Sequence, residues 1–372
     1  MRVLFLSWRD QTHPDGGGSE VYVESVAAGL ADRGHDVTVL CPRHAGLRGP
    51  ETRQGFRILP RGGRLTVYLH GLLHLLRRRH GRRGSYDVVV DVVNGLPFLS
   101  PLVRRRGVVA LVHHLHREQW QIIYPGPAGR VGWWVESSLF PRVYRKAPVL
   151  TVSEASRRDL VGLGFPAEQV TVARNGTPPL PAPRTSRSTT PLLCVLARLV
   201  PHKRIELAVD VVAELARELP DLRLELVGEG WWRDQVEQHV ARLGMSDRVT
   251  LLGRVSEQDK ADVLARAWVM VLPSVKEGWG IAVLEAAELG TPTVACRAAG
   301  GTEESVQDGM TGLLVDDDAD LAGAVRRLLT DTSAREAMGA AARNHASGYT
   351  WGTTTTVVEE ILERTSGLTR RR

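Results

Sequence analysis

Short apolar runs alternate with segments of helical periodicity along nearly the whole chain. The runs at 2–6, 88–93 and 108–112 are apolar at almost every position, which is typical of strands buried on both faces of a parallel sheet. Between them, segments such as 21–34 (VYVESVAAGLADRG) carry apolar residues at helical spacing, and Gly34 suits a helix C-terminus. The pattern predicts the α/β class, built from doubly wound, Rossmann-like units.

The alternation is interrupted by a proline-rich segment at 176–191 (GTPPLPAPRTSRSTTP). This composition offers little to a hydrophobic core, so we place an interdomain linker at 179–190. The N-terminal domain is then 1–178 and the C-terminal domain 191–349. A last helix, at about 350–372, has no strand after it and is expected to pack back on the N-terminal domain. Because ligands bind outside the carboxyl ends of parallel strands, the two domains should face a central cleft that holds the site.

The chain has 372 residues, of which 43% are hydrophobic and 24% are charged. This length and composition fit two globular domains. Cys41, Cys194 and Cys296 lie far apart beside apolar runs, so we expect buried thiols in a reducing compartment. The N-terminus lacks the apolar core of a secretory signal, and prolines and polar residues interrupt the longest apolar stretch, 88–103. We therefore expect a cytoplasmic protein.

Charge is distributed unevenly. The stretch from Arg43 to Arg106 contains fourteen arginines and three acids, a net of +11, whereas the whole chain carries +6. Such asymmetry favours contact with an anionic lipid surface, a phosphorylated substrate or nucleic acid, although an arginine-rich chain could also simply solvate its helices with arginine. The aromatic residues of this stretch are not clustered into stacking platforms, so nucleic acid is not an expected partner.

The segment 66–84 (TVYLHGLLHLLRRRHGRRG) resembles a basic amphipathic helix. Its leucines precede Arg77, Arg78, Arg79, Arg82 and Arg83, and helices of this kind lie on anionic membranes. Peripheral association with the inner membrane face is therefore one interpretation. The other is that the leucines, Leu72 and Leu76 among them, belong to the hydrophobic core.

Glycines stand between the first strand and the first helix, in GGGSE at 16–20. The backbone N–H groups of Gly17 and Gly18 could receive an anion at the helix N-terminus. The G-x-G-x-x-G spacing of a dinucleotide site is missing, and a plain tight turn is the alternative.

Two cations follow the first strand of the C-terminal domain. Arg198 ends that strand and Lys203 lies five residues later, just before a helix, so together they could hold a diphosphate. Two exposed surface cations are the alternative.

A second element of the same domain, KEGWGIAVLE at 276–285, combines glycines with two acids. Gly278 and Gly280 allow close approach to a ligand at a helix start, while Glu277 and Glu285 could each meet sugar or ribose hydroxyls. Such a glutamate pair is also common on solvated helix faces. The run Asp316 to Asp318 follows a strand and precedes a helix, so we interpret it as helix capping rather than as a metal site.

Five motifs together resemble the retaining glycosyltransferases of the GT-B fold, family four of the sequence classification, over nearly the whole chain. They are GGGSE (16–20), ARLVPHK (197–203), VGEG (227–230), LGRV (252–255) and EGWGIAVLE (277–285). The resemblance implies a nucleotide diphosphate sugar as donor, held mainly by the C-terminal domain, with no cofactor and no metal. The loops between Leu115 and Arg145, rich in tryptophan, could suit a sugar, an aminocyclitol or a lipid-linked acceptor.

Roles follow from the same resemblance. Arg198 and Lys203 correspond to the diphosphate clamp, Glu277 to the residue that touches the donor sugar and Glu285 to the ribose ligand. His113 is favoured over His114 as the histidine that contacts the donor sugar, since successive side chains after a strand point to opposite sides.

The implied catalytic set is thus His113, Glu277, Arg198 and Lys203. His114 and Asn175 are expected on the acceptor side. The remaining donor-binding candidates are Gly17, Gly18, Gly228, Gly253, Arg254, Val255, Gly278, Trp279, Gly280 and Ile281. A nucleotide-sugar epimerase of the same fold is the alternative function.

Overall fold

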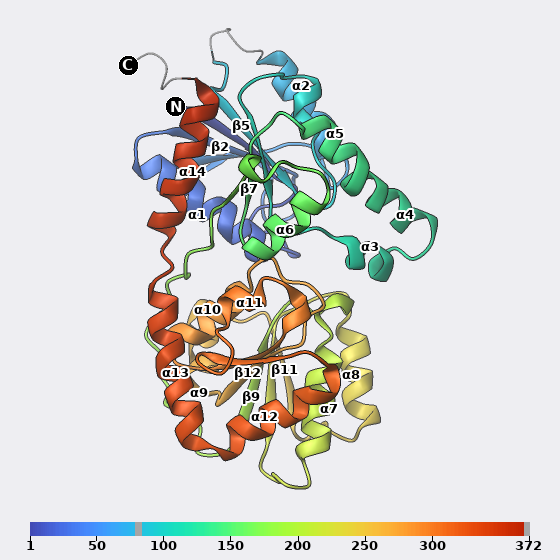
Figure 1. Cartoon of the computed structure of the whole chain (residues 1–372), viewed down its shortest axis with the longest axis vertical. Coiled ribbons are helices and arrows are strands. Elements are labelled where there is room, and N and C mark those ends of the chain that lie inside the picture. The colour runs from blue at the N-terminus through green and yellow to red at the C-terminus, as the bar shows by residue number, and fades with distance from the viewer. Residues whose placement is uncertain (79–83, 368–372) are drawn as a thin grey trace. The chain divides into compact units, whose positions relative to one another are not determined.

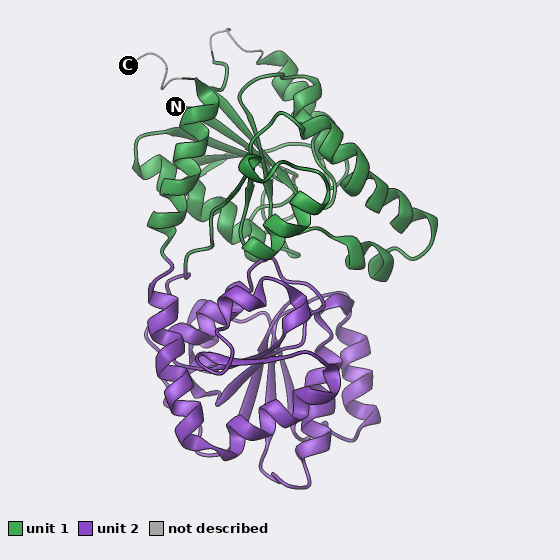
Figure 2. Cartoon of the chain, viewed as in Figure 1, with its two compact units in different colours: residues 1–176, 350–372 green, residues 177–349 purple. Residues whose placement is uncertain are grey.

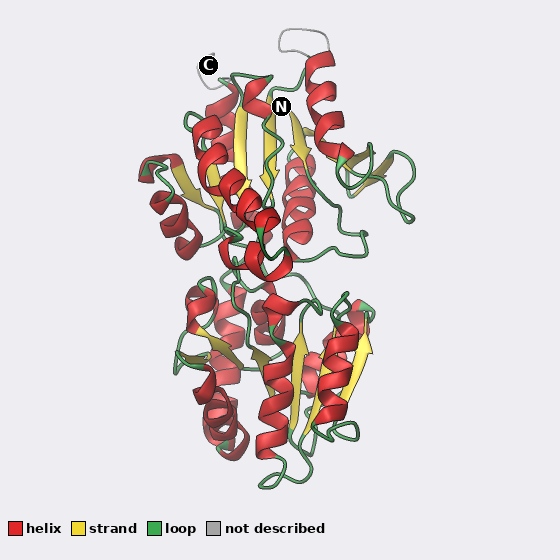
Figure 3. Cartoon of the chain, turned by 90° about the vertical axis from the view of Figure 1, so that its right-hand side faces the viewer, coloured by secondary structure: helices red, strands yellow, loops and turns green. Residues whose placement is uncertain are grey.

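The computed structural model describes residues 1–78 and 84–367 (Figure 1). The chain divides into two compact units, which Figure 2 shows in different colours. Unit 1 comprises Met1–Gly176 and Thr350–Arg372, and unit 2 comprises Thr177–Tyr349. In each unit a mostly parallel sheet carries helices on both faces (Figure 3), which confirms the predicted α/β class with two Rossmann-like domains.

Unit 1 is built on a sheet whose described strands run in the order β3-β4-β2-β1-β5-β6-β7-β8. All neighbouring pairs are parallel except β3 with β4, because these two form a hairpin. The hairpin was not expected from the sequence. The strands are β1 (Arg2–Leu6), β2 (Asp36–Cys41), β3 (Glu51–Arg53), β4 (Phe56–Pro60), β5 (Val88–Val93), β6 (Val108–Val112), β7 (Val149–Thr151) and β8 (Val170–Val172).

The faces of this sheet are covered by helices whose apolar sides complete two clusters of buried residues. One cluster includes Val112 and Phe140, and the other includes Leu6 and Phe98. The helices of unit 1 are α1 (Gly18–Asp32), α2 (Thr66–Arg77), α3 (Arg117–Ile123), α4 (Pro127–Trp134), α5 (Phe140–Tyr144), α6 (Glu154–Gly162) and α14 (Trp351–Ser366), with a π-helical turn at Val135–Leu139.

Unit 2 has a parallel sheet with the order β11-β10-β9-β12-β13-β14. Its strands are β9 (Leu192–Leu196), β10 (Arg223–Val227), β11 (Val249–Gly253), β12 (Val269–Leu272), β13 (Thr293–Cys296) and β14 (Gly312–Val315). Its helices are α7 (Ile205–Leu215), α8 (Arg233–Arg242), α9 (Glu257–Arg266), α10 (Ile281–Glu288), α11 (Thr302–Ser305), α12 (Leu321–Thr330) and α13 (Thr332–Ser347). The three cysteines are buried free thiols, as the sequence suggested.

The segment 179–190, expected as a linker, is fastened to unit 2. The Arg184 guanidinium pairs with Asp262 at 2.6 Å and with Asp259 at 2.8 Å, and Arg187 donates to the Thr291 hydroxyl at 2.6 Å. Arginine side chains and Leu180, which packs against a hydrophobic cluster of unit 2, thus anchor this segment, and the division between the units falls at Gly176 and Thr177.

Helix α14 belongs to unit 1, where it lies beside α1 (Figure 1). The Tyr22 and Trp351 rings meet edge to face with their centroids 5.8 Å apart, and the Glu359 carboxylate accepts from Arg33 and His35, both at 2.6 Å. The sequence predicted this helix as far as residue 372, and the last five of these positions lie outside the described residues.

The contact between α1 and α14 leaves no room for a side chain at Gly29. A Cβ at this position would lie 2.5 Å from Oγ1 of the buried Thr355. We therefore expect Gly29→Ala to destabilise unit 1 by about 1–3 kcal/mol, although alanine normally favours a helix. The matched control is Gly352→Ala in α14, where the nearest atom is 3.7 Å away and stability should be unchanged or slightly raised. Differential scanning calorimetry compares the variants, and equal midpoints would contradict this account of the packing.

Candidate functional site

The loops after β9 and β10 in unit 2 approach each other unusually closely. The main chain of Ala197 donates to Val227 and that of Leu199 to Glu229, which continues the strand pairing beyond the sheet. Gly228 has a φ of +134°, and a Cβ there would lie 1.9 Å from the Ala197 carbonyl oxygen. Glycine is therefore required, and the contact places the half-buried Arg198 at the carboxyl edge of the sheet.

Lys203 and Glu277 form an ion pair at the same edge. The Lys203 Nζ lies 2.5 Å from Glu277 Oε1, and both side chains are largely buried, at 15% and 12% exposed. Lys203 sits in a 3-10 turn (Pro201–Lys203) that begins with a proline after β9. Glu277 is held by its main chain, since its N–H donates to Ala299 at 2.8 Å and its carbonyl accepts from Gly301 at 3.1 Å. The structure thus brings two predicted residues into contact from loops that are 74 positions apart.

The turn from Glu277 to Ile281 ends at the N-terminus of α10, with Gly280 as N-cap at a φ of +88°. Because the first N–H groups of a helix lack intrahelical partners, this end can accept phosphate oxygens. The Trp279 side chain points elsewhere. It is 2% exposed and its ring packs edge to face against Tyr349 at 5.0 Å, so only its main chain could face a ligand.

Glu285 lies in α10 and is buried, at 6% exposed. Its Oε1 accepts from the Lys260 Nζ at 2.6 Å. Burial raises the pKa of Glu285, and the neighbouring Lys260 opposes that rise. Lys260, on α9, was not singled out from the sequence, because nothing in its surroundings there indicates a partner on α10.

The loop after β11 holds the residues expected beside the nucleotide base. Gly253 has a φ of +70°, its carbonyl accepts from Gly228 at 2.9 Å, and a Cβ would lie 2.5 Å from Glu229 Oε1. Arg254 is exposed, and Val255 is half-buried at a surface pocket within unit 2 that also includes Leu252.

In unit 1, His113 is the first residue after β6 and is buried, at 8% exposed. Its ring packs edge to face on Tyr22 at 5.2 Å, and its Nε2 has no hydrogen-bond partner among the residues described. His114 differs, since its ring stacks on His116 at 4.4 Å and its Nε2 lies 3.1 Å from Gln119 Nε2. The two histidines therefore occupy separate environments.

Asn175 is a second buried polar residue of unit 1 with an unpaired side-chain atom among the residues described. It follows β8, is 4% exposed, and its Oδ1 accepts no hydrogen bond within the described chain. An unpaired buried oxygen is costly in a fold, so both Asn175 and His113 are candidates for contact with a ligand.

The glycine loop before α1 is already capped by the chain itself. The Gly17 N–H donates to Glu20 Oε2 at 2.7 Å, and Glu20 Oε1 lies 3.4 Å from Arg9 Nε. The proposed role of Gly17 as an anion receiver is therefore not available through its N–H in this structure. Glu20, at position N3 of the helix, was not among the predicted site residues, although a glutamate at N3 is a recognised capping signal.

Unit 1 also contains a hydrogen-bond network around Glu136 that was not predicted from the sequence. Buried Glu136 accepts from the His116 main chain, from His116 Nδ1 and from Trp120 Nε1, each at 2.9 Å, and His116 Nε2 reaches Asn94 at 2.9 Å. This network fixes the segment that follows His114. Its members are spread over 94–136, and no local motif connects them.

The aspartates 316–318 are engaged in capping and ion pairs. The Asp317 side chain accepts from the Ala319 N–H, which confirms the capping interpretation, while Asp316 pairs with Arg297 and Asp318 with Arg204. Across residues 1–78 and 84–367, no group of three or more His, Cys, Asp or Glu side chains is placed to hold a metal ion. Nor does any helix in those ranges have the length and apolar character to cross a membrane.

The buried state of His113 predicts a pH dependence of stability. Burial lowers the pKa of His113 to about 4 from 6.5, so the unfolded chain binds more protons than the folded chain between these values. Stability should fall as the pH is lowered through this window, by up to about 1.4 kcal/mol per pH unit. Chemical denaturation of His113→Gln should show a shallower dependence of the unfolding free energy on pH. Some dependence should remain because burial also lowers the pKa of His74 to about 4. An unchanged slope would contradict the buried, neutral imidazole.

Comparisons with known proteins agree with this geometry. Residues 17–176 match the glycosyl transferase 4-like domain and residues 179–345 match glycosyl transferases group 1. The chain is 31% identical to the D-inositol 3-phosphate glycosyltransferase of Kineococcus radiotolerans, over 94% of this chain and 91% of that protein. It is 28% identical to the GDP-mannose-dependent alpha-(1-6)-phosphatidylinositol monomannoside mannosyltransferase of Mycolicibacterium smegmatis, over 94% and 95%.

Among solved structures, sucrose-phosphate synthase from Thermosynechococcus elongatus has a TM-score of 0.77 at 21% identity and covers 100% of this chain and 98% of that chain. This likeness concerns the fold, and it agrees with the GT-B arrangement of two Rossmann-like domains. Since family matches cover both units and a full-length relative shares 31% of its sequence, the chain belongs to the group 1 glycosyltransferases.

Proposed function

We propose that the protein transfers a glycosyl group from a nucleotide diphosphate sugar to an acceptor hydroxyl with retention of the anomeric configuration. The observation that carries the proposal is the arrangement at the carboxyl edge of the unit 2 sheet. There the Lys203–Glu277 pair and the N-terminus of α10 lie on loops that the main chain holds in place, with Arg198 at the end of β9. Positive charge of this kind suits a departing diphosphate.

In the proposed reaction, Arg198 and Lys203 stabilise the negative charge that grows on the leaving diphosphate. The acceptor oxygen attacks from the face that the diphosphate leaves, and its proton passes to a leaving phosphate oxygen. No side chain has to form a covalent bond. Glu277, which holds Lys203, is the proposed contact for the donor sugar hydroxyls, Glu285 for the ribose, and His113 is the residue of unit 1 proposed to contact the sugar.

One relative supports this donor class, because it is named as dependent on GDP-mannose. Another is named D-inositol 3-phosphate glycosyltransferase, which bears on the acceptor. We propose by analogy a nucleotide sugar as donor here and a sugar, aminocyclitol or lipid-linked hydroxyl as acceptor. The alternative of a nucleotide-sugar epimerase finds no support in the family matches, which name glycosyl transfer in both units.

Replacing Lys203 tests the proposal. Lys203→Gln should lower kcat by about 10²–10³-fold, because one preorganised charge opposite the leaving group is lost. Lys146→Gln, which removes an exposed lysine of unit 1, should keep the activity of the native protein. Release of nucleoside diphosphate measures the rate, and the NMR coupling of the product anomeric proton reports the configuration. Full activity of Lys203→Gln, or an inverted product, would refute the proposed mechanism.

We also propose that unit 1 rests on an anionic membrane surface through α2. Val67, Gly71 and Leu75 are buried beneath this helix, whereas Leu69 and Leu73 are 58% and 38% exposed on its outer side. Leu65 precedes them by one turn and is 73% exposed, and the described cations Arg64, Arg77 and Arg78 flank the leucines. Exposed leucines bordered by arginines suit an interfacial helix. The expected cations Arg79, Arg82 and Arg83 lie outside the described residues.

The membrane proposal predicts a specific effect of the outer leucines. The double variant Leu69→Ser with Leu73→Ser should release the protein from vesicles of anionic lipid, because about 0.8 kcal/mol is lost for each apolar carbon withdrawn from the interface. Leu102→Ser, which alters a leucine 65% exposed elsewhere in unit 1, is the matched control. Vesicle sedimentation at low and high salt measures binding. Equal recovery of all three proteins with anionic and neutral vesicles would rule out the membrane role.

A further inference from the structure

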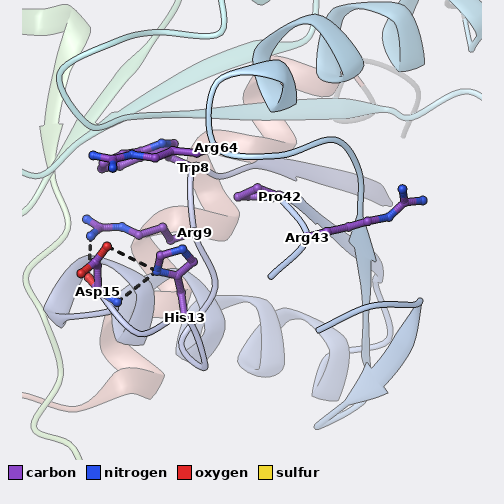
Figure 4. Close-up of a pocket in the computed structure, with 7 residues that line it drawn as sticks. All are labelled: Trp8, Arg9, His13, Asp15, Pro42, Arg43 and Arg64. Carbon is purple, nitrogen blue, oxygen red and sulfur yellow. Dashed lines mark hydrogen bonds and ion pairs between the residues drawn. The ribbon is translucent and has the colours of Figure 1, made fainter. Parts of the chain in front are cut away.

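A small pocket of unit 1 lies where several parallel strands end. It encloses about 40 Å³, against roughly 10–15 Å³ for one ordered water on the same measure. Its lining follows β1, β2 and β4, so it opens at the carboxyl edge of the sheet. Figure 4 shows the lining residues, which are Trp8, Arg9, His13, Asp15, Pro42, Arg43 and Arg64.

Two guanidinium groups gather on one indole ring in this pocket. The Cζ atoms of Arg9 and Arg64 lie 4.3 Å and 5.6 Å from the Trp8 ring centroid. In Figure 4 Arg64 overlaps the Trp8 ring and Arg9 lies beside them, while Arg43 points away. Because each cation lies against the ring, Trp8 orients the two planar forks and restricts their rotamers.

The two arginines differ in how they are held. Arg9 is 6% exposed, and it is fixed by its contact with Glu20 and by donation from Nη1 to the Asp15 carbonyl. Arg64 is exposed, and among the residues described no carboxylate lies within ion-pair distance of it. Arg9 is therefore held rigidly in the wall of the pocket, whereas the Arg64 guanidinium can contact a ligand or solvent.

His13 lines the same pocket with a ring of defined tautomer. Its Nδ1 accepts from the Asp15 N–H at 3.0 Å, so the neutral imidazole carries its proton on Nε2. Burial lowers the pKa of His13, and the nearby Arg9 lowers it further. The only carboxylate in the described lining is that of Asp15, whose side chain is 54% exposed and therefore well screened by water.

We propose that this pocket binds a phosphate group carried by the acceptor. The inference rests on the proposed glycosyl transfer and specifies its second substrate. Arg9 is held by Glu20 and by the Asp15 carbonyl, whereas the Arg64 fork has no carboxylate partner among the residues described. Between them the two guanidinium groups carry more N–H donors than these contacts use, and such donors match the several oxygens of a phosphate. The phosphate belongs either to a free phosphorylated polyol or to a lipid headgroup.

The position of the pocket suits an acceptor that extends toward His113. In the sheet, β1 is separated from β6 by β5 alone, so the two strand ends are about 10 Å apart. Glu20 lies between them, since it contacts Arg9 at 3.4 Å and its charge acts on His113. A phosphate anchored at Arg9 and Arg64 would leave one ring of sugar size to span this distance.

The test uses the full chain with a saturating nucleoside diphosphate, so that the donor site is filled and cannot bind the probe. Glycerol 3-phosphate is titrated by calorimetry against the native protein, Arg64→Gln and the control Arg106→Gln, which removes an exposed arginine outside the pocket. In a second arm, vesicles of phosphatidylglycerol replace the soluble probe. Arg64→Gln should weaken binding about tenfold or more, and Arg106→Gln by far less.

The outcomes separate the sources and the hypotheses. Loss confined to Arg64→Gln with glycerol 3-phosphate indicates a free phosphorylated acceptor. Weakening on vesicles alone indicates a headgroup in the pocket if it exceeds the weakening caused by Arg77→Gln, which removes another exposed cation at the end of α2 but outside the pocket. Equal weakening by both variants, or no binding of either probe, overturns the phosphate pocket. Binding of the nucleoside diphosphate is measured first in the same samples. If the nucleoside diphosphate does not bind, the proposed glycosyl transfer is contradicted. If it binds but the phosphate probes do not, only the phosphate pocket is contradicted.

Discussion

The ion pair between Lys203 and Glu277 is the interaction on which the unit 2 site depends. Neither side chain could be held there alone at little cost, because each is largely withdrawn from water. Each is instead positioned by main-chain geometry, Lys203 by the proline-led turn after β9 and Glu277 by its pairing with Ala299 and Gly301. If a diphosphate binds here as proposed, the lysine can turn its remaining N–H donors to it without giving up the carboxylate, since an ammonium group carries three.

Glycine makes this arrangement possible. Gly228 lets the loop after β10 lie against that after β9, and Gly301 lets the loop after β13 lie against Gly278, whose carbonyl oxygen would be 2.3 Å from any Cβ. In unit 1 a charged contact holds the corresponding loops together. Glu20 caps α1 and contacts Arg9, so one buried carboxylate joins the glycine loop to the arginine pocket. In both units the loops at the carboxyl edge are packed against one another by contacts that substitution would break.

The sequence predicted most of the fold because the strands of parallel sheets are apolar on both faces and stand out as runs. The hairpin of β3 and β4 was not predicted, because the strand from Glu51 to Arg53 is polar and lies at the sheet edge. A local signal does exist. Gln54 and Gly55, with φ of 44° and 81°, form a turn of the type that joins the strands of a hairpin. Helix α13 was missed because its small residues give little amphipathic contrast. Of the site, the motifs indicated Lys203 and Glu277. Lys260 is recognisable only once α9 and α10 meet, whereas Glu20 carried a local signal, its N3 position in α1, that the prediction did not use.

The most direct measurement of the central claim is a thermal shift panel with UDP, GDP and TDP sugars. A ligand present at 100 times its Kd stabilises a protein by roughly 2.7 kcal/mol. We expect at least one of these donors to raise the unfolding midpoint, the bare nucleoside diphosphate to retain most of the shift, and Lys203→Gln to abolish it. If no nucleotide sugar shifts the midpoint of the native protein at millimolar concentration, the donor site proposed for unit 2 is wrong.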